Sequence, residues 1–158
     1  MRRQDREVKD MNNILNIVSK CKVCRIAMLD KNKTYIVPLN YGYSYNDKAL
    51  LLFFHSAPEG RKIDLLKSNP DVCFEMDCGH GLVTGDIACK YGYIYESVIG
   101  EGKIIFIENE EEKLYALNQI MKHQTETDKD YIFDDSTLRR TIVYKLAVET
   151  INGKVKKI

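Results

Sequence analysis

The chain has 158 residues, of which 44% are hydrophobic and 30% are charged, and its formal net charge is +1. This composition is ordinary for a soluble globular protein, and the charge balance excludes the basic excess expected of a protein that coats nucleic acid. The length predicts a single domain covering residues 1–158.

The distribution of apolar residues and cysteines indicates a cytoplasmic protein. No apolar run approaches the ~20 residues of a membrane span, and the basic N-terminus lacks the apolar segment of a secretory signal. The five cysteines are an odd number, whereas a secreted disulfide scaffold usually carries an even number in a shorter chain. We therefore expect no membrane and no nucleic-acid partner.

The first third of the chain predicts a helix followed by antiparallel strands. Apolar residues at three- and four-residue spacing predict a helix from Asp5 to Lys20. Strands are predicted at 23–29 and 34–43, with a polar turn between them. Pro38 lies inside the second strand, and because proline cannot donate to the sheet it marks an edge, a bulge or a break. Neighbouring backbone groups there would be free to bind a ligand.

The segment from Ala49 to Pro70 predicts an anion site. After a turn at 45–48, an apolar strand at 49–54 ends in a polar turn and leads into a short helix at 62–68. Backbone N–H groups and the helix dipole converge at such a helix start, where cations are disfavoured unless an anion is bound. Arg61 and Lys62 lie at this point and predict a site for the phosphate of a cofactor.

The second half of the chain predicts two long strands and one long helix. Gly100 and Gly102 interrupt the longer strand and predict a bulge or a sharp bend. A turn is predicted at Asn152–Gly153. The predicted elements are, in order, a strand at 71–76, a glycine-containing loop at 77–91, a strand at 92–108, a helix at 109–123 capped by Asn109, a weakly patterned polar stretch at 124–140 and a strand at 141–150.

The order of these elements predicts a mainly β protein. Six strands joined largely by short connections favour an antiparallel β-barrel, closed or partly closed, with peripheral helices. A doubly wound parallel sheet would need a helix between successive strands, and too few helices are predicted.

Four motifs standing in this order resemble one known family. They are PLNYGY, FFHSAPEGRKIDLLKSNP, VCFE and YESVIGEGKI. The sequence resembles the nitroimidazole-resistance (Nim) proteins and their relatives, within the pyridoxamine 5′-phosphate oxidase-like flavin-binding split barrels. The resemblance implies a six-stranded antiparallel split barrel of the FMN-binding type. It also implies a homodimer with FMN or FAD at the interface.

The resemblance further implies which residues contact the flavin. A strand, a turn, a helix start and part of the long strand correspond to cofactor-contacting segments of the family. The implied cofactor-binding residues are Val37, Pro38, Leu39, Asn40, Phe54, His55, Ser56, Ala57, Gly60, Arg61, Lys62, Ser97, Val98, Ile99 and Gly100. Because the flavin would supply the redox chemistry, no protein nucleophile is required.

His55 is the one candidate catalytic residue. It follows two phenylalanines at a strand end, where it is expected at the barrel mouth, and its ordinary pKa lies near neutral. Contact with the cofactor or a substrate is favoured over the alternative, a structural histidine that caps the turn. Cys21 and Cys24 form a CxxC at a helix C-terminus, the wrong end to activate a thiol, so buried inert thiols are expected and no metal site is predicted.

Three functions remain open from the sequence. The resemblance implies a flavin-dependent oxidoreductase that reduces a small oxidant or nitroaromatic compound such as a 5-nitroimidazole. The same residues would serve a flavin-binding carrier or sensor without turnover. Oxidation of pyridoxamine phosphate is less favoured, because Lys90, Arg139 and Arg140 form no clear motif for a second phosphate.

Overall fold

The structure, a computed structural model, describes residues 3–46 and 48–157. Asp47, part of the turn predicted at 45–48, lies outside the described residues. The elements in chain order are two-residue strand β1 (Glu7–Val8), α1 (Met11–Lys20), β2 (Cys24–Asp30), β3 (Lys33–Leu39), β4 (Gly42–Tyr45), β5 (Leu50–Ser56), α2 (Arg61–Ser68), β6 (Asp71–Val83), β7 (Gly92–Ile107), α3 (Glu110–Thr125), α4 (Asp135–Arg140) and β8 (Ile142–Lys156), with short 3₁₀ helices at Gln4–Arg6 and Ala88–Lys90.

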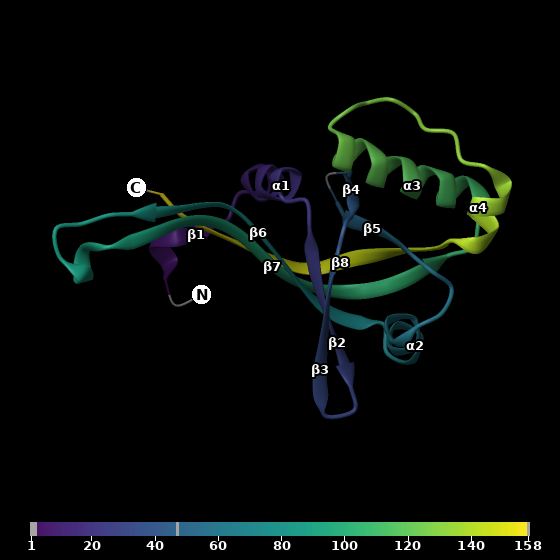
Figure 1. Cartoon of the computed structure of the whole chain (residues 1–158), viewed down its shortest axis with the longest axis horizontal. Coiled ribbons are helices and arrows are strands. Elements are labelled where there is room, and N and C mark those ends of the chain that lie inside the picture. Colours follow the sequence, from purple (N-terminus) through teal and green to yellow (C-terminus); the bar gives the residue numbers. More distant parts are fainter. Residues whose placement is uncertain (1–2, 47, 158) are drawn as a thin grey trace.

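The strands form one antiparallel sheet that curls into an open barrel (Figure 1). The strand order is β3-β2-β6-β7-β8-β5-β4, with β1 paired to β8. β3 and β4 therefore lie at opposite ends of the hydrogen-bonded path, although only Asn40 and Tyr41 separate them in the chain. The sheet must curve back on itself to allow this connection, which leaves a split between these two strands. The predicted mainly β split barrel is confirmed.

The described ranges contain eight strands rather than the six expected. The strand predicted at 34–43 divides at Asn40–Tyr41 into β3 and β4, and β1 supplies a second additional strand. β1 also shortens the predicted first helix, which begins at Met11 and is capped by the side chain of Asp10. Pro38 lies on β3, an edge strand of the sheet, as its missing N–H predicts.

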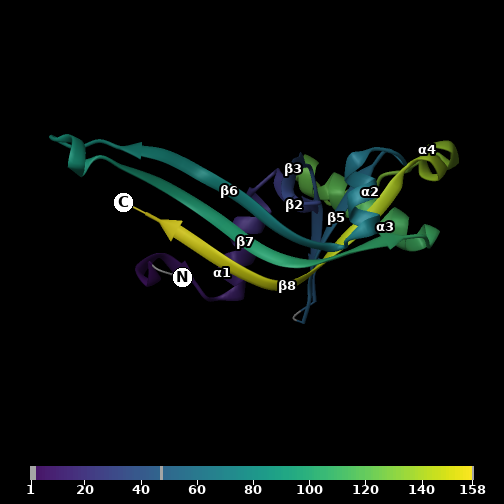
Figure 2. The same cartoon turned by 90° about the horizontal axis from the view of Figure 1, so that it is seen from below.

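The first seven residues of the loop predicted at 77–91 are strand. β6 continues to Val83 through an irregularity between Cys78 and Gly81 that adds one residue to β6. Glycine in the sequence here marks a bulge and not the end of the strand. β6 and β7 consequently extend well beyond the body of the barrel as a long curved ribbon (Figure 2).

The predicted turn at Asn152–Gly153 is also wrong, because both residues lie inside β8. Asn152 pairs with Ile99 on β7, and Gly153 pairs with both Val98 on β7 and Val8 on β1. Hydrogen bonding to strands on both sides holds this Asn-Gly dipeptide in an extended conformation, although by itself it favours a turn.

A bulge is present at the predicted glycines, but its extra residue lies in β8, and β7 itself runs through without interruption. The register of β7 against β8 shifts between Glu101 and Gly102. A Cβ atom at Gly102 would lie 2.1 Å from the carbonyl oxygen of Ala147, so only glycine fits the close approach of the two strands. The polar stretch at 124–140 includes the short helix α4, which was not predicted.

The hydrophobic core lies in two clusters. The larger fills the barrel under α1 and includes Ile17, Val18, Ile26, Phe54, Phe74 and Tyr144. The smaller lies between α3 and the sheet and includes Phe53, Leu117 and Ile120. In the part of the chain that the structure describes, no helix is long and apolar enough to cross a membrane.

Candidate functional site

The predicted strand–turn–helix arrangement around Gly60 is present. β5 ends at Ser56, and α2 begins at Arg61 after a short turn. Gly60 precedes the helix with φ 125°, a conformation that favours glycine, and no side chain caps the first turn. An uncapped helix start leaves backbone donors available to an anion. Arg61 and Lys62 are the first two residues of the helix.

Arg61 is held in a defined position by two neighbours from the β2–β3 hairpin. Its Nη2 and Nε atoms donate to Asp30 Oδ2 at 2.6 and 3.0 Å. Its guanidinium carbon lies 4.2 Å from the centre of the Tyr35 ring. A carboxylate and a cation–π contact thus orient the guanidinium beside the start of α2.

Lys62 is the second cation of this group, and His55 lies close enough to feel its charge. Burial lowers the pKa of the half-buried Lys62, and no ion pair to it is found among residues 3–46 and 48–157. His55 is open to solvent on one side. Partial loss of water on the other side lowers its pKa below the usual 6.5, and the charge of Lys62 adds to this effect. A bound anion would favour the charged form of both groups and so raise their pKa values.

The predicted residues of β3 divide between the two faces of the strand. Val37 and Leu39 pack against the barrel core, whereas Pro38 is exposed on the other face. The Asn40 side chain follows the strand, and its Nδ2 donates to the carbonyl oxygen of Lys22 and to Gln124 Oε1, both at 3.1 Å. The Asn40 amide nitrogen thus ties the split of the barrel to α3.

The predicted residues of β7 alternate in the same way. Val98 and Gly100 face the core, while Ile99 is 58% exposed. Register connects this segment to β3 through two intervening strands. Ile99 pairs with Glu75, Glu75 with Arg25, and Arg25 with Pro38, so these four residues form one row across the sheet. Pro38 and Ile99 therefore share the outer side of the sheet.

Phe54, Ser56 and Ala57 lie at increasing distance from the core. Phe54 is fully buried and stacks on Tyr144 with ring centres 5.6 Å apart. Ser56 is half-buried and Ala57 is exposed. Phe54 therefore supports the wall of the barrel from within, while the two following residues lie on its surface beside α2.

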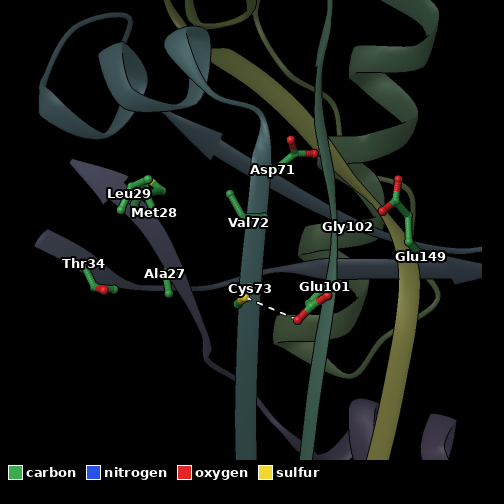
Figure 3. Close-up of a pocket in the computed structure, with 10 residues that line it drawn as sticks. All are labelled: Ala27, Met28, Leu29, Thr34, Asp71, Val72, Cys73, Glu101, Gly102 and Glu149. Carbon is green, nitrogen blue, oxygen red and sulfur yellow. Dashed lines mark hydrogen bonds between the residues drawn. The ribbon is translucent and has the colours of Figure 1, made fainter. Parts of the chain in front are cut away.

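The outer side of the sheet also carries a hollow of about 400 Å³ (Figure 3). Cys73 and Glu101 face each other there from β6 and β7, with the thiol donating to Oε1 at 3.9 Å. The lining residues are Ala27, Met28, Leu29, Thr34, Asp71, Val72, Cys73, Glu101, Gly102 and Glu149. None of them belongs to the predicted site, so the cationic group at α2 and the hollow are separate features of the described surface.

Cys21 and Cys24 are buried free thiols. Cys21 follows the C-terminus of α1 and Cys24 opens β2. Burial raises the pKa of both thiols, which makes them unreactive. Within the described residues, no group of three or more histidine, cysteine, aspartate or glutamate side chains is placed to hold a metal ion.

Several residues beside the site were missed from the sequence. Asp30 and Tyr35, which position Arg61, belong to a hairpin distant in the chain, and no local pattern pairs them with α2. Arg25 was also missed. It donates to Glu75 at 2.9 Å and to Asp77 at 2.6 Å on the outer side of the sheet. Only its exposed position on an alternating strand could have marked it.

Comparison with known families identifies the fold and its relatives. The family model described as pyridoxamine 5′-phosphate oxidase matches residues 10–155. The chain belongs to this family. The resemblance drawn from the four motifs is confirmed at this level. No curated protein matches the sequence significantly.

Three solved structures are similar to this chain in fold. A candidate 5-nitroimidazole antibiotic resistance protein from Bacteroides thetaiotaomicron VPI-5482 is 37% identical over 94% of this chain and 86% of its own, with a TM-score of 0.81. An FAD and haem binding protein from Mycobacterium smegmatis shares the fold at 13% identity and a TM-score of 0.82, over 97% of this chain and 74% of its own. An FAD-binding protein from Mesorhizobium loti shares it at 20% identity and a TM-score of 0.66, over 96% of this chain and 98% of its own.

Proposed function

We propose that this protein binds a flavin, FMN or FAD, and uses it to reduce small oxidants such as nitroaromatic compounds, including 5-nitroimidazoles. The observation that carries the proposal is the cationic group at the uncapped start of α2. Arg61, Lys62 and His55 converge there with free backbone donors. This arrangement fits the phosphate of a flavin nucleotide.

The position of this group relative to β3 supports the proposal. Arg61 lies over Tyr35, and the four residue-to-residue steps from Tyr35 to Leu39 span ~13 Å along the strand. A ribityl chain that starts at the phosphate site could follow β3 towards Pro38. The edge position of β3 leaves backbone groups near Pro38 for the polar edge of the ring system.

The bound flavin would supply the redox chemistry, and the residues of the chain would bind and orient it. Arg61 and Lys62 would neutralise the phosphate, and Gly60 permits the turn that presents them. His55 would hydrogen-bond to the cofactor or to the oxidant at the barrel mouth. A second copy of the chain, in a homodimer, would complete the site, and the exposure of Pro38 and Ile99 is consistent with this proposal.

The relatives support the same function. The 37% identical Bacteroides thetaiotaomicron protein is described in terms of 5-nitroimidazole resistance, and more distant structures with this fold are described as FAD-binding. Cytoplasmic location remains part of the proposal.

Turnover tests the proposal. Purified protein loaded with FMN or FAD is mixed with a 5-nitroimidazole and NADH or NADPH, and loss of the nitro absorbance is followed. We expect steady reduction that depends on the bound flavin. Flavin binding without reduction of nitroimidazoles or quinones indicates a carrier or sensor instead. Formation of the aldehyde from pyridoxamine phosphate indicates an oxidase.

A further inference from the structure

The thiols of Cys21 and Cys78 come together in the structure although the two residues are distant in the chain. Cys21 follows α1 directly, and Cys78 lies on β6 where its register becomes irregular. Both cysteines are free, and Cys78 packs against the core cluster that contains Cys21. Burial raises the pKa of the Cys21 thiol, and among the neighbouring side chains the Cys78 thiol adds most to this rise. The two thiols therefore interact directly.

A buried tyrosine fixes the position of Cys21 relative to β6. The Tyr41 hydroxyl lies 3.1 Å from the carbonyl oxygen of Cys21. It also lies 3.2 Å from the sulfur atom of Met76, which is buried on β6. Cys78 is two residues further along this strand, and every second residue of a strand points to the same face. Cys78 therefore lies on the face of β6 that meets the end of α1.

An ion pair holds the end of α1 from the other side. Lys20 Nζ lies 2.9 Å from Glu96 on β7, and Glu96 pairs directly with Cys78. α1 therefore ends against the β6–β7 pair (Figure 1). The backbone beside Cys78 leaves the regular ladder, because Gly79 has φ 65° and the register shifts before Gly81. Small adjustments at this bulge can bring the two sulfur atoms into bonding distance while the rest of the sheet stays in place.

The two thiols differ in their access to solvent. Cys21 is 1% exposed, so reagents in solution do not reach it, whereas Cys78 is partly exposed. Burial raises the pKa of Cys78, and a hydrogen bond from Cys21 and the charge of Lys20 oppose this rise. An oxidant therefore meets Cys78 first, and Cys21 is placed to attack from inside the protein. Close placement of two reacting groups accelerates such a step even where neither group is strongly activated.

We propose that Cys21 and Cys78 are a site of reversible oxidation, where hydrogen peroxide converts the two thiols into an intrachain disulfide. The Cys78 thiol attacks one oxygen of the peroxide, the O–O bond breaks, and a sulfenic acid and one water form. The Cys21 thiol then attacks the Cys78 sulfur, the S–O bond breaks, and a second water leaves. The two thiols lose two electrons and two protons in total, and one peroxide is reduced to two waters. A dithiol reverses the reaction by exchange.

The disulfide connects three parts of the molecule. The carbonyl oxygen of Lys22, next to Cys21, accepts hydrogen bonds from Asn40 and Gln124 at the split between β3 and β4. A bond from Cys21 to β6 thus joins α1, the split and the β6–β7 pair. A cross-link between residues this far apart in the chain restricts the unfolded chain strongly, so the oxidised protein is the more stable form. None of these steps requires a bound flavin, so the disulfide is independent of the proposed function.

The experiment identifies linked cysteines and measures stability on the full-length chain. Reduced protein is treated with one equivalent of hydrogen peroxide, the remaining thiols are alkylated in denaturant, and mass spectrometry of the peptides identifies each linked pair. Thermal unfolding is followed before oxidation, after oxidation, and again after addition of dithiothreitol. The test variants are Cys78→Ser and Cys21→Ala. The matched control is Cys73→Ser, which removes an exposed thiol from the same strand.

We expect oxidation to link Cys21 to Cys78 in the wild type and the control and to raise the thermal midpoint by ~10 °C, with both changes reversed by dithiothreitol. Neither test variant should form an intrachain link or gain stability on oxidation, whatever its midpoint when reduced. A disulfide between Cys21 and Cys24 overturns the proposal. Oxidation confined to the exposed Cys73 and Cys89 also overturns it, as does a wild type that keeps all its thiols.

Discussion

The guanidinium of Arg61 lies 2.6 Å from the carboxylate of Asp30 and 4.2 Å above the ring of Tyr35. These contacts fix a cation beside the first turn of α2. The proposed phosphate site is thus preorganised, since ordering of a long side chain precedes ligand binding. This relationship leads to two predictions about affinity.

Removal of either cation at α2 is expected to weaken flavin binding. A hydrogen bond to a charged group contributes ~1.5–3 kcal/mol, so Arg61→Ala and Lys62→Ala should each lower the affinity ~10- to 100-fold. Fluorescence quenching of FMN and FAD measures the change. Arg139→Ala, an exposed arginine on α4, is the matched control and should leave affinity unchanged. Equal effects in all three variants would refute a specific role of α2.

Asp30→Asn is expected to tighten flavin binding a few-fold at low salt. The substitution removes the charge that partly neutralises Arg61, while the Tyr35 contact still orients the guanidinium. The gain should shrink as salt is added, since screening weakens exposed charge interactions. Asp130→Asn, which removes a carboxylate paired with Lys122 elsewhere on the surface, serves as the control. A salt-independent loss of affinity would show that Asp30 acts mainly by holding Arg61 in place.

Two buried tyrosines should respond oppositely to loss of the hydroxyl. Tyr41 donates to the carbonyl oxygen of Val18 at 2.6 Å and lies within 3.1 Å of that of Cys21, whereas the equally buried Tyr144 hydroxyl has no partner within the described chain. Tyr41→Phe should therefore cost ~1–3 kcal/mol, while Tyr144→Phe should be neutral or stabilising. Urea denaturation of both variants measures the difference, and equal destabilisation would contradict the hydrogen-bond assignment.

Stability is expected to fall as the pH drops below about 6.5. Burial lowers the pKa of His123, and that of His55 shifts in the same direction. The unfolded chain then binds more protons than the folded chain, so the free energy of unfolding is largest above the ordinary pKa and declines through the acid range. The slope contributed by His123 is at most ~1.4 kcal/mol per pH unit, and that of the more exposed His55 is smaller because solvent screens it.

The contacts of His123 allow a more specific test of this pH dependence. Its Nδ1 and Nε2 lie 2.8 and 3.1 Å from the carbonyl oxygens of Tyr41 and Ser19, and a neutral ring can donate to only one of them. Denaturation between pH 5.5 and 7.5 should show a smaller slope in His123→Gln than in the wild type. A wild-type protein that becomes more stable towards acid would indicate instead that His123 is held as an imidazolium.

Gly102→Ala is expected to destabilise the barrel by ~2 kcal/mol or more. The new methyl group would meet the carbonyl oxygen of Ala147, which belongs to the backbone of β8 and cannot rotate away. Glu101→Ala, at the neighbouring exposed position, is the control and should change stability by less than ~0.5 kcal/mol. Similar thermal unfolding midpoints for the two variants would contradict the close approach of the strands.

Local residue chemistry predicted those parts of the fold where it agrees with the tertiary structure. Pro38 marked an edge strand, Gly102 marked a bulge, and Asn109 accepts a hydrogen bond from the Glu112 amide at the start of α3 as expected. Local residue chemistry gave a wrong prediction at Asn152–Gly153, where pairing with strands on both sides overrides the turn preference.

The candidate site, too, could be predicted only where its residues are contiguous in the chain. The start of α2 could be predicted because its strand, turn and helix are contiguous in the chain. The Asp30 contact and the use of the Asn40 amide within the chain both depend on residues distant in sequence. Pairing over such distances is decided by the curvature of the whole sheet, which a local pattern does not contain.

The most direct test of the central claim is the visible absorbance of the purified full-length protein, together with the mass of the cofactor that it releases. We predict flavin absorbance and a released mass equal to that of FMN or FAD, at about one flavin per chain. Protein that is colourless, and whose spectrum and flavin fluorescence do not change when FMN and FAD are added, would contradict the proposed function.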